Sequence, residues 1–279
     1  MGSFFSPMKV VYACTIAGSD PSGGAGIQVD LRTLASLGIW GLSVITALTA
    51  QSPSAVRRVE PVPPPMIASQ CEALLEAFPI GAFKTGMLGT AAACRAVADL
   101  LPGDIPLVID PVMVATSGGR LLDEDAVEAM IEHLLPRATL LVPNLDEAEV
   151  LTGRPVRDLQ EMREVGEALR ALGAGAVLVK GGHAAGPEAV DLLVDGAGAH
   201  PFSAPRLPFE VHGSGCCLSA AIAGGLALGL PLREAVALGK NVVSGAIAAS
   251  IPAPDGRRMA NPRPVHSPPC GCFPPPGSP

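Results

Sequence analysis

Residues 212–217 read His-Gly-Ser-Gly-Cys-Cys and open a run of small, uncharged residues that reaches Leu232. The glycines let the backbone approach an anion closely, and Ser214 is a candidate N-cap for a helix predicted over Leu218–Leu228. The free N–H groups of such a turn point at a bound anion. A thiol in the same turn lies at the positive end of the helix dipole, which favours the thiolate and makes Cys216 a candidate base or nucleophile. The segment predicts a phosphate-holding, proton-moving turn; tight helix packing without a ligand is the alternative.

Further charged and polar side chains follow predicted strands. Asp110 ends one buried strand, and Glu147 follows the next, three residues after Asn144. Asn144 with Glu147 fits a capping box, whereas Glu147 with Asp110 suits Mg²⁺ held through water, and the two interpretations are compatible. Lys180 ends another strand beside two glycines, where a cation suits a polyphosphate, although a solvated lysine is also consistent with that place.

The apolar run Val10–Ile16 is followed by a glycine-rich stretch at 17–26, and periodic apolar residues resume over Ile27–Leu37. This order predicts strand, loop and helix, and loops at the carboxyl ends of parallel strands are where open α/β sheets bind ligands. The stretch has neither G-x-G-x-x-G spacing nor a P-loop Gly-Lys-Ser/Thr, so its ligand need not be a nucleotide. A connecting turn without a ligand is the alternative. The side chains expected to line a pocket above these first strands are Asp30, Gln51 and Met87.

Strands and helices alternate along the rest of the chain. Strands are predicted at Leu42–Thr49, Gly81–Thr85, Pro106–Ile109, Thr139–Val142 and Ala176–Lys180. Helices are predicted at Pro65–Ala77, Ala91–Leu101, Glu124–Leu134, Leu159–Leu172 and Leu232–Ser250, with an edge hairpin of Ala189–Val194 and Ala199–Phe202. This alternation predicts an α/β fold with a mostly parallel sheet covered on both faces.

Composition limits the possible partners. The net charge of −7, with no basic cluster beyond Arg57-Arg58 and Arg257-Arg258, argues against nucleic acid. Residues 33–56 carry no charge, but glycines, Gln51 and Pro53 interrupt them, which favours helix, turn and buried strand over a membrane span. No signal peptide is evident over residues 1–10. An odd count of seven cysteines without a regular framework predicts reduced thiols and a cytoplasmic protein.

The last 28 residues, from Pro252, contain ten prolines, which makes helix or sheet unfavourable there. We expect disorder beyond about His266. The pair Cys270 and Cys272 supplies only half of a tetrahedral metal site. The chain is therefore divided into an extension over 1–9, a folded domain over 10–265 and a tail over 266–279.

Seven stretches together resemble the hydroxymethylpyrimidine/phosphomethylpyrimidine kinases of thiamine biosynthesis, within the ribokinase-like family. They occur in order between about residues 10 and 250 and leave out only the tail. The stretches are Thr15–Gln28 (TIAGSDPSGGAGIQ), Ser43–Leu48 (SVITAL), Lys84–Gly89 (KTGMLG), Asp110–Met113 (DPVM), Pro143–Leu145 (PNL), Lys180–His183 (KGGH) and His212–Cys216 (HGSGC).

The resemblance implies a ribokinase-like three-layer α/β/α fold, usually dimeric, that transfers the γ-phosphoryl group of MgATP. The implied acceptor is the hydroxymethyl group of 4-amino-5-hydroxymethyl-2-methylpyrimidine, then the resulting monophosphate; a monovalent cation is left open. By resemblance, the anion hole and base are Gly213, Ser214, Gly215 and Cys216, and the Mg²⁺ shell is Asp110 and Glu147. Lys180 and Asn144 are implied for ATP, and the residues implied around the pyrimidine are Gly18, Ala25, Asp30, Gln51, Met87 and Val112.

Two departures from the family pattern stand out: Cys217 where Thr is common, and Thr116 where many members have Lys. Neither removes a group that the expected mechanism requires. A pyridoxal kinase of the same superfamily is the nearest alternative, because pyridoxine also presents a hydroxymethyl group on a heteroaromatic ring. A pyrimidine-binding sensor without catalysis is the alternative from another class. Sugar-phosphorylating relatives usually have Asp at the Cys216 position, which makes that activity a weaker expectation.

Overall fold

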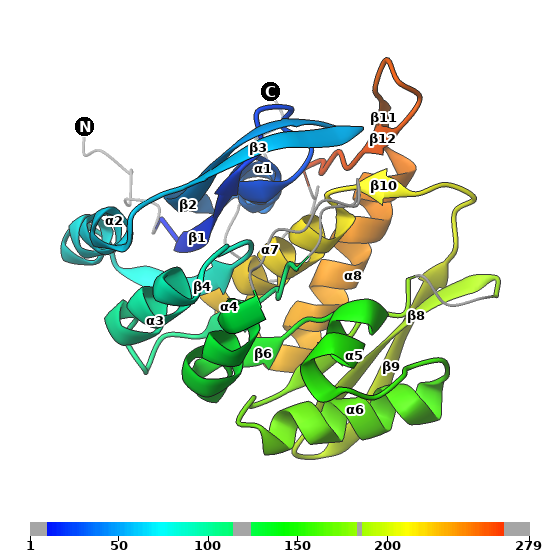
Figure 1. The fold of residues 1–279 in the computed structure, drawn as a ribbon. Helices are drawn as coiled ribbons and strands as arrows, with labels where there is room; N and C mark the ends of the chain where they lie inside the picture. The colour runs from blue at the N-terminus through cyan, green and yellow to red at the C-terminus, as the bar shows by residue number, and fades with distance from the viewer. Residues whose placement is uncertain (1–9, 114–123, 183–185, 265–279) are drawn as a thin grey trace, which may run out of the picture.

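The computed structural model describes residues 10–113, 124–182 and 186–264. Within them, the main sheet has the strand order β3-β2-β1-β4-β5-β6-β7-β8-β9 (Figure 1). The strands from β2 to β7 in this order pair in parallel, whereas β3, β8 and β9 are added in antiparallel fashion. The strands are β1 Tyr12–Ser19, β2 Trp40–Ser52, β3 Ala55–Pro61, β4 Ile80–Thr85, β5 Leu107–Ile109, β6 Leu140–Leu141, β7 Val177–Val179, β8 Glu188–Asp195 and β9 Gly198–Pro205.

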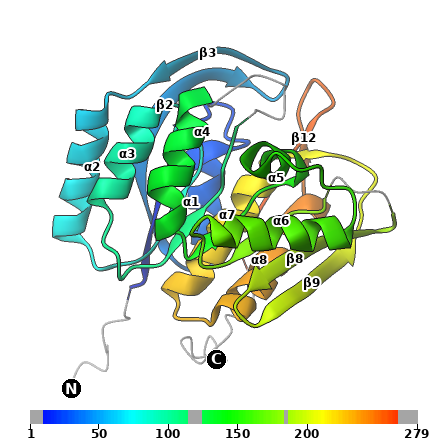
Figure 2. The same ribbon diagram turned by 60° about the horizontal axis from the view of Figure 1, so that its bottom comes forward.

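Helices cover both faces of this sheet (Figures 1 and 2). One face carries α2 Pro64–Ala77, α3 Ala91–Leu100, α4 Glu124–Ala129, α5 Leu145–Thr152 and α6 Leu159–Ala171. The other carries α1 Gly26–Ser36, α7 Ser214–Ala227 and α8 Leu232–Ala248. Successive strand side chains point to opposite faces, so Val108 of β5 belongs to the core beneath α7 while Ile109 belongs to the other core. The predicted three-layer α/β/α architecture is confirmed.

Local boundaries differ from the prediction in places where tertiary pairing decides the structure. β3 was not predicted, because its exposed, charged outer residues give little apolar signal. The helix predicted over 124–134 is α-helical only over α4 and continues as a π-helical turn at Met130–Leu134. The helix α5 was foreseen only as a possible capping box, although Asn144 and Glu147 do form that box. The predicted hairpin is present as β8 and β9.

A second, small sheet of order β10-β12-β11 packs beside the N-terminus of α7. Its strands are β10 Val211–His212, β11 Ile251–Pro252 and β12 Arg258–Met259. The expectation of no sheet after Pro252 is therefore wrong for Arg258–Met259, because pairing with β10 overrides the local proline content. Thr116, His183 and the Cys270/Cys272 pair lie outside the described residues, as do the extension over 1–9 and the tail over 266–279, which stay predictions.

The uncharged run at 33–56 forms the end of α1, a turn, all of β2 and the first two residues of β3. Among the described residues, no helix combines the length and the apolar character needed to cross a bilayer. The interpretation of this run as helix, turn and strand is confirmed.

Candidate active site

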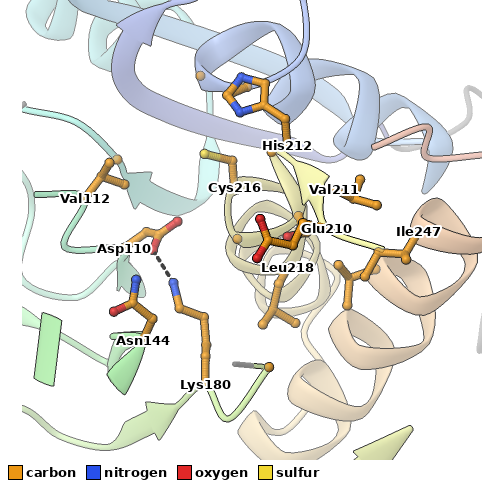
Figure 3. Close-up of a pocket in the computed structure, with 18 of the residues that line it drawn as sticks. Asp110, Val112, Asn144, Lys180, Glu210, Val211, His212, Cys216, Leu218 and Ile247 are labelled. Carbon is orange, nitrogen blue, oxygen red and sulfur yellow. Dashed lines mark hydrogen bonds and ion pairs between the residues drawn. The ribbon is translucent and has the colours of Figure 1, made fainter. Parts of the chain in front are cut away.

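A cavity of about 890 Å³ opens at the carboxyl ends of β1, β4, β5, β6 and β7. The N-terminus of α7 closes one side of it, and the loop before β10 and the helix α8 extend it toward the edge of the sheet (Figure 3). All predicted site residues line this cavity except Asp30. The topology thus brings together side chains from distant parts of the sequence, as expected for the carboxyl edge of a parallel sheet.

The anion-binding turn is built on a glycine in the left-handed region. Gly213 is the N-cap of α7 with φ of 79°, and a Cβ on it would lie 1.9 Å from the carbonyl oxygen of Gly24. The helix therefore begins at Ser214, four residues earlier than predicted, and the side chain of Ser214 does not cap it, which corrects the sequence interpretation. The N–H of Cys217 makes the first intrahelical bond, to the Gly213 oxygen at 2.9 Å. The preceding N–H groups of 214–216 are left to bind a ligand.

A buried cation faces this turn. Lys180 Nζ lies 2.9 Å from Asp110 Oδ1 and 3.6 Å from Glu147 Oε2, and Ser219 donates to Asp110 Oδ2 at 3.0 Å (Figure 3). A Cβ placed on Gly215 would lie only 3.4 Å from Lys180 Nζ. The positive end of α7 and the Lys180 amine therefore converge on one point, which suits an anion such as a transferring phosphoryl group.

The two carboxylates are in different electrostatic states. Burial opposes ionisation of Asp110, but Lys180, Lys84 and the hydrogen bond from Ser219 outweigh it and hold its pKa below the usual value. Burial raises the pKa of Glu147, with Asp110 adding to the effect and Lys180 opposing it. Burial alone would lower the pKa of Lys180, yet the two carboxylates raise it, so its amine is charged. Asp110 is therefore ionised beside the positive Lys180, whereas Glu147 is protonated more easily than an ordinary glutamate.

Asp110 and Glu147 fit the Mg²⁺ role in their chemistry. Mg²⁺ is usually bound by one or two carboxylates together with waters and substrate phosphates. Glu147 uses Oε2 to accept from the N–H of Asn144 at 2.7 Å, while Oε1 takes part in no described hydrogen bond. Within the described ranges, no group of three or more His, Cys, Asp or Glu forms a ready-made metal site. This donor set suits an ion that arrives with the nucleotide.

Cys216 is half-buried at the cavity wall and points toward it from the first turn of α7 (Figure 3). Burial raises the pKa of its thiol to about 12; Asp30 and Asp110 add to this, and Lys84 opposes it. The lowered pKa expected from the helix terminus is therefore not found in the free protein, because burial and the nearby carboxylates outweigh the charge of Lys84. The neighbouring Cys217 is fully buried, and burial likewise raises its pKa, to about 11.

Uncharged residues line another part of the cavity and are called the uncharged wall below. Its predicted residues are Gly18, Ala25, Gln51, Met87 and Val112. A Cβ on Gly18 would lie 3.1 Å from the sulfur of Met87, so glycine at this position lets the methionine pack close to the backbone of β1. The combination of glycine, a thioether and a side-chain amide suits a planar heteroaromatic ring.

Asp30 lies beneath this wall. Its Oδ2 is 2.8 Å from Lys84 Nζ and 2.6 Å from Thr15 Oγ1, and its side chain is fully buried. The expectation that Asp30 faces the ligand directly is not met in this structure, because Lys84 comes between the helix and the cavity and itself lines it. Its assignment as a pyrimidine contact stays a prediction.

Comparison with known proteins is consistent with this geometry. Residues 20–261 match the family model described as phosphomethylpyrimidine kinase. The chain belongs to the phosphomethylpyrimidine kinase family. It is 48% identical over 241 residues to the hydroxymethylpyrimidine/phosphomethylpyrimidine kinase of Rhizobium meliloti, covering 85% of this chain and 91% of the relative. It is also 46% identical over 250 residues, 88% of its length, to the thiamine biosynthesis bifunctional protein ThiED of Geobacter sulfurreducens, of which it spans about half, 51%.

The fold of this phosphomethylpyrimidine kinase family member is similar to those of two solved structures. The phosphomethylpyrimidine kinase of Clostridium difficile has a TM-score of 0.75 at 41% identity, with 85% of this chain and 99% of that chain covered. The pyridoxal kinase of Bacillus subtilis, solved as an ADP complex, has a TM-score of 0.83 at 34% identity, with 90% and 97% covered. The fold is thus shared by both kinds of kinase.

Several residues of this family member's site were not assigned a role from sequence. Asp20 accepts hydrogen bonds from the N–H groups of Ser22 and Ala25 at 2.9 Å, and His212 Nε2 lies 3.2 Å from it. Asp20 and His212 thereby join the glycine-rich loop to the anion-binding turn. Both residues, like Lys84, stand inside the motifs that carry the resemblance, and that position was the only signal the sequence offered.

Proposed function

We propose that the protein phosphorylates 4-amino-5-hydroxymethyl-2-methylpyrimidine with ATP and then phosphorylates the monophosphate to the diphosphate. One observation carries this proposal. The α7 N-terminus lies next to Lys180 and Asp110, and the same cavity contains the uncharged wall of Gly18 and Met87. A phosphoryl group bound beside the α7 N-terminus and Lys180 would have the aromatic acceptor on one side and ATP on the other.

Each group then has a chemical task. The N–H groups of Ser214, Gly215 and Cys216 bind the oxygens on which charge accumulates during transfer, and Lys180 adds a fixed positive charge. Asn144 shapes the ATP side through the capping box that orients Glu147. Mg²⁺ held by Asp110 and Glu147 would neutralise charge on the transferred phosphate oxygens.

Cys216 is the group placed to take the acceptor proton in the first phosphorylation. Its pKa of about 12 leaves the thiol protonated in the free protein, so the base must form as substrate and ATP bind and change its surroundings. The second phosphorylation starts from a phosphomonoester, which is already ionised near neutrality and needs no base. The two steps thus place different demands on Cys216.

Pyridoxal kinase activity is the second candidate. It is favoured by the pyridoxal kinase neighbour, whose TM-score of 0.83 exceeds the 0.75 of the phosphomethylpyrimidine kinase structure. The higher sequence identity, 41% against 34%, favours the pyrimidine instead, because side chains rather than backbone distinguish two planar rings.

Phosphorus NMR of the purified protein with MgATP and hydroxymethylpyrimidine, repeated with pyridoxal, tests the proposal. We expect a monophosphate and then a diphosphate of the pyrimidine. Phosphorylation of pyridoxal alone would transfer the function to the second candidate. ATP hydrolysis that is independent of either acceptor, or no turnover, would contradict both.

We further propose a cytoplasmic homodimer. The five described cysteines, all free thiols, support a reducing compartment. Sedimentation of the purified protein tests the dimer: a single species at the monomer mass would contradict it.

A further inference from the structure

The backbone around Lys180 is held on both sides. The N–H of Lys180 donates to the carbonyl oxygen of Pro143 at 2.8 Å, and the N–H of Gly181 donates to Asp191 Oδ1 at 3.0 Å. These two peptide groups flank the Cα of Lys180, so together they fix the direction in which its side chain leaves β7. The amine then reaches Asp110 and the anion-binding turn.

The backbone of Gly181 packs tightly against β8. Gly181 is buried, and a Cβ on it would lie 2.0 Å from the carbonyl oxygen of Val190, so only glycine lets this loop pack against β8. The loop is pressed onto the strand that carries Asp191. Loss of the hydrogen bond to Asp191 would leave the buried Gly181 N–H without an acceptor, which costs free energy.

Asp191 is itself held by a cation from α8. Lys240 Nζ lies 2.6 Å from Asp191 Oδ2 and donates to the oxygen of Ala189 at 2.9 Å. Both side chains are almost fully buried, Asp191 at 4% exposure and Lys240 at 8%, and both line the cavity. Burying two charges costs free energy that a pair of apolar residues would avoid, so such a pair is weak evidence for a purely stabilising role.

We propose that Asp191 and Lys240 are positioning residues for Lys180. They act through the N–H of Gly181, and they orient the amine that meets the transferring phosphate. The inference rests on the proposed phosphotransfer. Its consequence is selective: the pair governs the use of ATP and leaves pyrimidine binding unchanged, because the uncharged wall of Gly18, Gln51 and Met87 comes from other strands.

Two matched double variants test this inference. Lys240→Met with Asp191→Asn removes the charges but keeps an oxygen that accepts from Gly181, whereas Lys240→Met with Asp191→Leu has similar size and no acceptor. We expect the Leu variant to have a KM for ATP at least about tenfold above that of the Asn variant, because a small misplacement of a catalytic group is costly. The KM for hydroxymethylpyrimidine should stay equal in the two. Equal KM values for ATP in both variants would overturn the inference.

A second series keeps the test decisive if the Leu variant folds poorly. Lys240→Arg preserves a cation for Asp191 and should retain the wild-type KM for ATP, whereas Lys240→Met alone should raise it. If Lys240→Arg and Lys240→Met raise it equally, the inference fails. Calorimetry of ATP binding reads the same effect without turnover. Wild-type protein that binds ATP but phosphorylates neither acceptor would refute the proposed function, while the calorimetric comparison would still decide the positioning role.

Discussion

The Lys180 amine lies 2.9 Å from the Asp110 carboxylate, although the two residues are 70 positions apart in the sequence. Lys180 directly follows β7 and Asp110 directly follows β5, and β6 lies between these two strands of the parallel sheet. Asp110 is buried and the Lys180 side chain is only 14% exposed, so their charges are weakly screened by solvent and are expected to act strongly on a bound phosphate.

Lys180→Met is therefore expected to lower kcat by about 100-fold or more, as loss of a preorganised charge at a transferring group does, and to raise the KM for ATP by at least about tenfold. Binding of hydroxymethylpyrimidine, measured by calorimetry, should be unchanged, because Gly18, Gln51 and Met87 belong to β1, β2 and the loop after β4, whereas Lys180 follows β7. The matched control is Arg163→Met, which removes an exposed cation from an i, i+4 ion pair on α6 and should leave kcat unchanged. A loss of pyrimidine affinity equal to the loss of kcat would contradict the assignment of Lys180 to phosphate.

Alanine substitutions of the two glycines in the anion-binding turn should have different effects on stability and on activity. Gly213→Ala puts a Cβ 1.9 Å from a backbone oxygen at positive φ, so it should disrupt the turn and lower the melting temperature. Gly215→Ala fits the helix but points its methyl group at Lys180, and should leave the melting temperature near that of the wild type while blocking phosphoryl transfer.

The control for these variants is Gly245→Ala, at an exposed helical position of α8 with nothing within 4 Å. It should raise stability by about 0.5–1 kcal/mol without affecting turnover. Thermal melts and steady-state rates separate the three cases. Full activity of Gly215→Ala would remove the N-terminus of α7 from the mechanism.

The pH dependence should differ between the two phosphorylations. Below a pKa of about 12, the thiolate fraction of Cys216 rises as pH increases, by about tenfold per unit. The kcat/KM for hydroxymethylpyrimidine, which reports the free protein, should therefore rise from pH about 7 to 9 in the wild type, and this rise should be absent in Cys216→Ala. Phosphorylation of the monophosphate, which needs no base, should lose far less activity in that variant. Equal losses in both steps would count against the base assignment.

The Lys84–Asp30 pair beneath the cavity should matter for stability. Lys84→Met leaves the fully buried Asp30 carboxylate with only Thr15 as a partner and should cost about 3–5 kcal/mol of unfolding free energy. Urea denaturation measures this cost. The control is again Arg163→Met, whose exposed ion pair with Glu167 contributes less than about 1 kcal/mol. Similar midpoints for both variants would show that Asp30 is readily neutralised.

The sequence predicted the layers, the parallel sheet and most elements, because apolar runs buried on both faces are long and unambiguous. All the predicted site residues except Asp30 line the cavity, some predicted from motifs at strand ends and others from the resemblance. The sequence did not predict β3, whose apolar signal is weak, or β12, whose pairing partner β10 is remote in the sequence. It predicted that the helix terminus favours the Cys216 thiolate, because a helix start is visible in the sequence while burial and the Asp30 and Asp110 charges are not. The Asp191–Lys240 pair lies outside every recognised motif, so only the contacts reveal it.

The link between Asp20 and His212 joins residues that are 192 positions apart. During synthesis the glycine-rich loop leaves the ribosome early, yet its partner from the anion-binding turn emerges only after most of the chain has been made. A nascent or prematurely terminated chain therefore contains the first strands but lacks the turn that would bind the transferring phosphate. A chain that ends before His212 is therefore expected to lack this link and to be unable to transfer phosphate.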